Sequence, residues 1–151
     1  MDTNEKQLYV SANAYYQGAT ILMRPPEGLG IHSAQLVQPA VTCAAMSLKL
    51  YLKCLLAIEG KDKEDTIYRI SELYRNLAES AKQLILRKFN EFSNTNLSSD
   101  DLIRHLEALD AAFVKWRYIH EEYAKSVNIE DLEEMTLAAK ATVIALKPDW
   151  A

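Results

Sequence analysis

The sequence predicts an all-α protein, a bundle of about five helices built around a long central second helix. Residues 41–58 are apolar or small at nearly every position. One narrow stripe of the helix is polar, formed by Gln35, Gln38, Thr42, Lys49 and Lys53. A helix that is apolar over most of its circumference has to be covered on several sides, which predicts that this segment is the centre of the bundle. The chain contains only four glycines and four prolines, a scarcity that favours long helices over many short strands.

The composition is that of a single globular domain covering residues 1–151. Domains typically contain about 100–150 residues, so this length is enough to close a hydrophobic core. The fractions of hydrophobic (49%) and charged (25%) residues are ordinary for a soluble protein and exclude disordered and fibrous classes. A formal net charge of -4 excludes a general affinity for polyanions, so a nucleic-acid site would have to be a local basic patch.

The two cysteines predict free thiols and a cytoplasmic protein. Cys43 and Cys54 are eleven residues apart in the central helix, about 16 Å along its axis, which is too far for a disulfide. Buried free thiols suit a reducing compartment, and the first residues lack the basic and apolar pattern of a secretory signal. Lys49 and Lys53 argue against a membrane span, which carries few or no charges.

The first two predicted helices are separated by a loop. Apolar residues recur at helical spacing over residues 5–20, whereas residues 23–30 contain two adjacent prolines and two glycines, which predict a loop. The central helix begins either near Pro39, in a first turn where a missing N–H costs nothing, or near Ser33 with a kink at the proline. The apolar surface continues on both sides of Pro39, so we favour the kinked helix. Gly60 is well placed to end it.

Three further helical patterns follow. The first covers residues 67–92, and a bend or break is expected at residues 78–81, which carry only small apolar side chains. A polar linker at residues 94–99 leads to the next helix, where Ser98 and Asp101 have the spacing of a capping box. That helix carries a bundle seam with steps of four and three: Leu102, Leu106, Leu109, Phe113, Trp116, His120 and Tyr123. The last helix covers about residues 130–146, with Asn128 as its cap and with Leu132, Met135, Ala139, Val143 and Leu146 facing inward.

Residues 113–121 are the candidate site. Arg117 and His120 lie on one helix face, and an arginine beside a neutral histidine can hold a phosphate and exchange a proton with a ribose hydroxyl. Metal-independent RNA cleavage requires this pair of functions. The alternative is structural: His120 is a core residue of the seam, and Arg117 with Glu121 forms an ordinary i, i+4 ion pair. No two of the three histidines have the spacing of a helical metal site, and no cofactor-binding motif is present.

Three segments together resemble HEPN-domain proteins. Residues 44–60 resemble the long second helix of that family, which often reads "ELxLKALL" after a start of small residues. Residues 70–77 resemble its next helix, with an "LxxLxxxL" pattern, and residues 113–121 resemble the "FVxWRYxYE" segment of one HEPN-like subgroup. The resemblance covers roughly residues 15–146. It implies an all-α bundle, frequently dimeric, of the kind found in toxin–antitoxin, defence and nucleotidyltransferase-linked systems.

The resemblance also implies a function and shows where this chain departs from it. Active HEPN members are metal-independent RNases in which a histidine follows an arginine after four to six residues. Here only two residues separate Arg117 from His120, which favours a non-catalytic binding module over a nuclease.

We therefore expect a homodimeric HEPN-like module that contacts RNA, a nucleotide or a partner protein. The first alternative is a divergent endoribonuclease with Arg117 and His120 as catalytic residues, and the second is a structural or antitoxin-like subunit that dimerises through the seam. The predicted binding residues are Lys49, Lys53, Lys115, Trp116, Tyr118 and Glu121. The alternative for Lys49 and Lys53 is that their stems cover apolar surface while their ammonium groups reach water.

Overall fold

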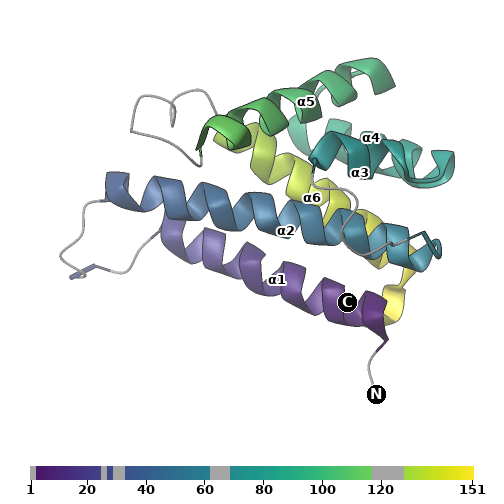
Figure 1. The fold of residues 1–151 in the computed structure, drawn as a ribbon, viewed down its shortest axis with the longest axis horizontal. Coiled ribbons are helices and arrows are strands. Elements are labelled where there is room, and N and C mark those ends of the chain that lie inside the picture. Colours follow the sequence, from purple (N-terminus) through teal and green to yellow (C-terminus); the bar gives the residue numbers. More distant parts are fainter. Residues whose placement is uncertain (1–2, 25–26, 29–32, 62–68, 117–127) are drawn as a thin grey trace.

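The computed structural model describes residues 3–24, 27–28, 33–61, 69–116 and 128–151 (Figure 1). Within these ranges every regular element is helical and no strand occurs, which confirms the all-α prediction. The α-helices are α1 (Asn4–Met23), α2 (Val37–Ile58), α3 (Ile70–Arg75), α4 (Glu79–Ser93), α5 (Ser99–Trp116) and α6 (Ile129–Leu146). Two short 3₁₀ helices, η1 (Ser33–Leu36) and η3 (Pro148–Trp150), complete the described elements.

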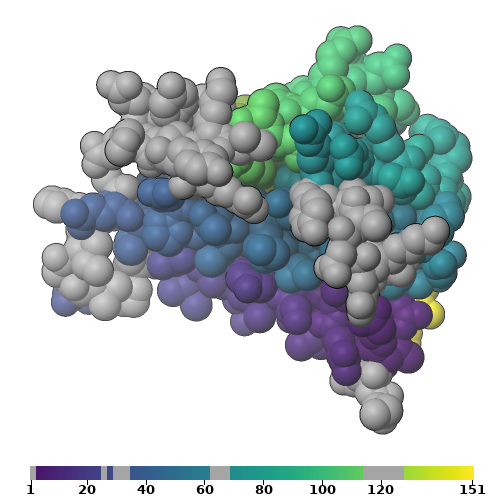
Figure 2. Space-filling model, in the orientation of Figure 1, coloured from purple at the N-terminus to yellow at the C-terminus, as the bar shows by residue number. Residues whose placement is uncertain are grey.

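The helix α2 is the centre of the bundle, as its composition predicts. It forms an antiparallel hairpin with α1 and also contacts α6 and α3, while α4 packs on α6 and α5 packs on α3 (Figure 1). Its apolar residues Leu48, Leu52 and Leu55 are completely buried. One side of α2 nevertheless reaches the surface between α1 and α3 (Figure 2). This open side carries the exposed residues Gln38, Thr42 and Met46.

The open side matters for the question of a membrane. Among the described residues, α2 is long and apolar enough to span a membrane by length and composition alone. Half of the apolar 18-residue stretch of α2 is buried inside the bundle. Core helices of soluble proteins have the same length and composition, so this property does not show that α2 spans a membrane. The predictions of a cytoplasmic location and of no membrane contact stay predictions.

The start of α2 differs from the kinked helix that we favoured. Residues 33–36 form a 3₁₀ turn, and the α-helix begins at Val37, so that Pro39 lies in its first turn. In that position the ring of proline displaces no intrahelical hydrogen bond, and no kink is needed. The other end is as expected: Gly60 has a φ of +74°, and Lys61 N donates to Leu56 O at 2.8 Å, which closes the helix.

The expected break near residues 78–81 separates α3 from α4. α3 ends at Arg75, and α4 begins at Glu79 after Ala78 in extended geometry. The carboxylate of Glu59 accepts a hydrogen bond from Ala78 N at 2.9 Å, so the end of α2 supplies the cap that α4 lacks locally. Among the described residues the bundle therefore has six α-helices, where about five were expected.

The helix ends and seams around α5 and α6 follow the sequence closely. Ser98 Oγ accepts from Asp101 N at 3.2 Å and Ser98 N donates to the Asp101 carboxylate, which is the predicted capping box. Asn128 Oδ1 caps α6 by accepting from Asp131 N at 3.0 Å. The inward positions whose side chains are described are buried or half-buried in both helices, except that Leu146 is exposed, because it lies in the last turn of α6 beyond the packed face.

Polar side chains of α2 also bond to α1 inside the hairpin. Ser47 is fully buried and its Oγ donates to Ala12 O at 2.8 Å, and Tyr51 donates its hydroxyl to Asn13 Oδ1. The thiol of Cys54 lies 3.2 Å from Glu5 O, and both cysteines are free, as predicted. These bonds satisfy polar groups that would otherwise be buried without partners.

The unfolding free energy should fall at alkaline pH because Cys54 is buried. Burial is the main cause that raises the pKa of its thiol to about 12. The unfolded thiol ionises near pH 8.5. The stability that the protonated thiol contributes is therefore fully present below that pH, and this contribution is lost as the pH rises toward about 12. Urea unfolding between pH 8 and 11 should show a steeper loss for wild type than for Cys54→Ala. Cys43→Ala is the control, and equal slopes for all three proteins would contradict this expectation.

Candidate functional site

The structure leaves the predicted Arg–His site untested. The four residues that would form its centre fall within residues 117–127, outside the described residues: Arg117, Tyr118, His120 and Glu121. Lys115 and Trp116 end α5, and their side chains also lie outside the described part. Whether these six residues form a site stays a prediction.

Lys49 and Lys53 are the two predicted binding residues whose side chains are described. They lie one turn apart on α2, and both are half-buried. Half-burial fits lysines whose stems pack on apolar surface, which is the alternative to phosphate contact. Lys49 and Lys53 follow Thr42 and Met46 by seven residues each, so they continue the same face of α2, and their role in binding stays a prediction.

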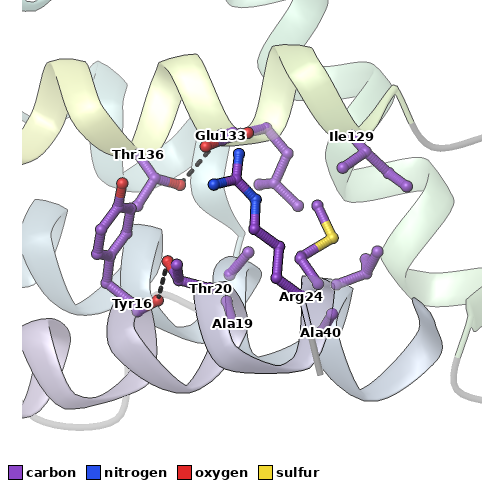
Figure 3. A pocket seen from close by; sticks show the side chains of 12 residues that line it. Tyr16, Ala19, Thr20, Arg24, Ala40, Ile129, Glu133 and Thr136 are labelled. Atoms are coloured by element: carbon purple, nitrogen blue, oxygen red, sulfur yellow. Dashed lines mark hydrogen bonds between the residues drawn. The ribbon is translucent and has the colours of Figure 1, made fainter. Parts of the chain in front are cut away.

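A pocket of about 350 Å³ opens between α1, α2 and α6 (Figure 3). The end of α1, the beginning of α2 and the first two turns of α6 form its walls. Small residues at the α1–α2 contact leave this space: Ala19 and Ala40 are buried, and Ala44 is half-buried. Val41 and Leu132, both buried, complete an apolar floor.

Polar side chains surround the mouth of this pocket. Arg24 follows the last turn of α1 and Glu133 projects from α6, and their side chains point toward one another across the opening (Figure 3). The two threonines are already engaged as donors, Thr20 to Tyr16 O at 3.0 Å and Thr136 to Leu132 O at 2.7 Å. Arg24 and Glu133 are both exposed to solvent.

The electrostatic surroundings of the pocket are mostly negative. Partial burial, and then the charge of Glu133, raise the pKa of the Tyr16 hydroxyl above its ordinary value. Lys140 Nζ lies 5.3 Å from the centroid of the Tyr16 ring, a cation–π distance. Burial and the neighbouring carboxylates of the first turns of α6 raise the pKa of Glu134. A second anion near Glu133 would therefore be repelled.

A histidine and an aspartate pair on the other side of α6. His105 Nδ1 of α5 lies 2.8 Å from Asp131 Oδ2, and the His105 ring packs against Phe89 of α4 edge to face. An ionised carboxylate only accepts hydrogen bonds, so Asp131 favours the tautomer with the proton on Nδ1 and leaves Nε2 without it. Arg104 is adjacent, but its guanidinium lies 3.1 Å from Asp101 Oδ1. The pair ties α5 to α6 beside a smaller cleft of about 270 Å³.

No metal-ligating group emerges among the described residues. Within them, no three His, Cys, Asp or Glu side chains lie close enough to hold a metal ion.

Neither the pocket nor the His105–Asp131 pair has a signal in the sequence. The pocket combines residues 16–24 with residues 129–136, and the pair is separated by 26 positions.

Comparison with protein-family models, curated proteins and solved structures found no match to this chain. The HEPN-like assignment therefore stays a prediction that rests on the resemblance of residues 44–60, 70–77 and 113–121 to that family. The function has to be inferred from the fold and from the geometry of the described residues.

Proposed function

We propose that this chain is a non-catalytic helical binding module and that a small ligand occupies the pocket between α1, α2 and α6. The observation that carries the proposal is the form of that pocket: an apolar floor within the bundle, and a few polar groups that converge at its mouth. Small-molecule sites usually have this form, with volumes of about 300–1,000 Å³. The pocket, with a volume of about 350 Å³, is at the lower end of that range.

The other features of the described residues favour binding less strongly. In the cleft beside His105, both side-chain pairs are already formed within the protein, His105 with Asp131 and Arg104 with Asp101. A ligand there would have to replace these contacts before it gained its own. A ligand on the apolar floor of the pocket near Glu133 does not have to replace such contacts, because covering apolar surface is itself favourable.

The proposal retains the binding module that the sequence predicts and gives it a ligand site on other residues. Binding of RNA, and the endoribonuclease alternative, depend on Arg117 and His120, and homodimerisation through the seam depends on Trp116 and Tyr123. These hypotheses are compatible with a ligand pocket elsewhere in the bundle. They receive no further support from the described residues.

A ligand screen with a filled pocket tests the proposal. Thermal unfolding would be followed with nucleosides, nucleotides, amino acids, amines and organic acids, and at least one class should raise the melting temperature of wild type. A ligand present at 100 times its dissociation constant stabilises by about 2.7 kcal/mol. Ala19→Met and Ala44→Met, which place a long side chain in the pocket, should abolish the shift measured against each variant's own baseline.

The matched control is Ala14→Met, which makes the same change at an exposed position of α1. It should keep the full ligand response. The proposal would be overturned if no class stabilised wild type, or if both filling variants responded to every stabilising ligand as wild type does.

A further inference from the structure

We infer that the ligand of the pocket is a free apolar α-amino acid of about the size of leucine. Its ammonium and carboxylate groups would lie between Glu133 and Arg24, and its side chain would cover the apolar floor. This inference rests on the proposed function, because it names the ligand class of the same pocket.

The two charged side chains at the mouth define what the ligand must offer. Glu133 accepts hydrogen bonds and Arg24 donates them, and they point toward each other from α6 and the end of α1 (Figure 3). A ligand that enters between them needs a donor on one side and an acceptor on the other. The ammonium and carboxylate of an α-amino acid are attached to a single carbon, so one small ligand meets both requirements.

The two threonine hydroxyl groups that line the pocket are already used as donors. The hydroxyl protons of Thr20 and Thr136 are donated to backbone carbonyls one turn earlier in their own helices. The lining residues of α1 and α2, and Leu132, Glu133 and Thr136 of α6, lie beyond the first turns of their helices. Their backbone N–H groups are therefore bonded along the helix and offer no cradle for a phosphate. Below the mouth, a ligand therefore meets alanine, valine and leucine side chains.

An apolar floor selects against ligands that are polar throughout. A nucleobase in this position would bury ring nitrogens and exocyclic groups without partners, which is unfavourable. The branched side chain of leucine has no such groups, and it gains from every part of the floor that it covers. Ala19, Ala40 and Val41 all line the pocket, and their side chains contain no polar atom that the ligand would leave without a partner.

Charge also excludes a purely anionic ligand. The beginning of α6 carries Glu130, Asp131, Glu133 and Glu134, and the whole chain has a net charge of -4. A phosphate or carboxylate without a compensating cation would approach Arg24 through this negative field. A zwitterion carries no net charge, and it places its cation against the carboxylate of Glu133.

Three probes separate the two contacts. Isothermal titration calorimetry would compare L-leucine, 4-methylpentanoate, which lacks the ammonium group, and 3-methylbutylamine, which lacks the carboxylate. Leucine should bind wild type at least tenfold more tightly than either analogue, which corresponds to about 1.4 kcal/mol. Glu133→Gln should weaken leucine about tenfold but should not weaken 4-methylpentanoate, from which it removes a repelling charge. Arg24→Gln should weaken leucine but should not weaken 3-methylbutylamine.

Matched controls make the same changes elsewhere. Glu130→Gln lies in the first turn of α6 and Arg87→Gln lies on α4, both at exposed positions outside the pocket lining. Both variants should bind leucine as wild type does. If leucine does not bind, or if Glu133→Gln weakens all three probes equally, the inference is wrong.

The two proposals can fail separately. Binding of a different ligand class that Ala19→Met abolishes, together with no leucine binding, would overturn this inference and keep the proposed function. If leucine binds and Ala19→Met and Ala44→Met both leave its affinity unchanged, leucine binds outside the pocket and the inference is wrong. The proposed function is wrong as well only if these two variants also respond to every other stabilising ligand as wild type does.

Discussion

Leu55→Ala is expected to lower the free energy of unfolding by about 3 kcal/mol. Leu55 is completely buried on α2, the helix that α1, α6 and α3 cover from different sides. The substitution removes three carbon atoms from a position that neighbouring helices cannot fill without moving, so a cavity remains in addition to the lost burial. Urea denaturation, followed by circular dichroism, measures the change as a lower midpoint with an unchanged slope.

One leucine and one isoleucine in the same hairpin serve as controls. Leu50 is half-buried on α2, and Ile21 is 60% exposed on α1. Leu50→Ala should cost less than Leu55→Ala, and Ile21→Ala should stay within about 0.5 kcal/mol of wild type. Equal losses at Leu55 and Ile21 would show that α2 is not the centre of the core.

The central position of α2 could be predicted because the information lies within the helix itself. Its apolar residues cover most of its circumference, and no partner needs to be known to conclude that such a helix is buried. The capping box at Ser98 and the end of α2 at Gly60 were predictable for the same reason, since each depends on residues three to five positions apart.

Features that depend on distant residues could not be predicted. The start of α2 was misplaced because an apolar surface on both sides of Pro39 is compatible with a 3₁₀ turn as well as with a kinked α-helix. The pocket needs the end of α1 beside the beginning of α6, positions that are more than a hundred residues apart. The local sequence around Arg24 or Glu133 does not distinguish either residue from any other exposed charged residue.

The predicted site shows the opposite case. Residues 113–121 stand out in the sequence because cationic, imidazole and aromatic groups are close together there, yet the structure does not describe residues 117–121. The described residues show another histidine with a carboxylate partner, His105 with Asp131, whose elements are adjacent only after folding. Reactive side chains that are close together in the sequence and side chains that meet only in the folded structure are therefore different sets of residues in this chain.

A second large loss of stability is expected at Asp110. The half-buried carboxylate of Asp110, on α5, accepts hydrogen bonds from Ile70 N at 2.7 Å and from Ser71 N at 3.0 Å, and it also accepts the Ser71 hydroxyl. Asp110 thus caps α3 across a separation of 40 residues. A helix of six residues is too short to be stable by itself, so this cap supports both the start of α3 and its contact with α5.

Asp110→Ala should lower the free energy of unfolding by about 3 kcal/mol, because it leaves buried backbone N–H groups of Ile70 and Ser71 without an acceptor. Asp110→Asn keeps one carbonyl oxygen and should lose about half as much. Asp100→Ala, at an exposed position in the first turn of α5, is the control and should lose no more than about 1 kcal/mol. Hydrogen exchange locates the effect: the amides of α3 should lose protection first in Asp110→Ala, and equal loss across all helices would mean that the cap does not act on α3 itself.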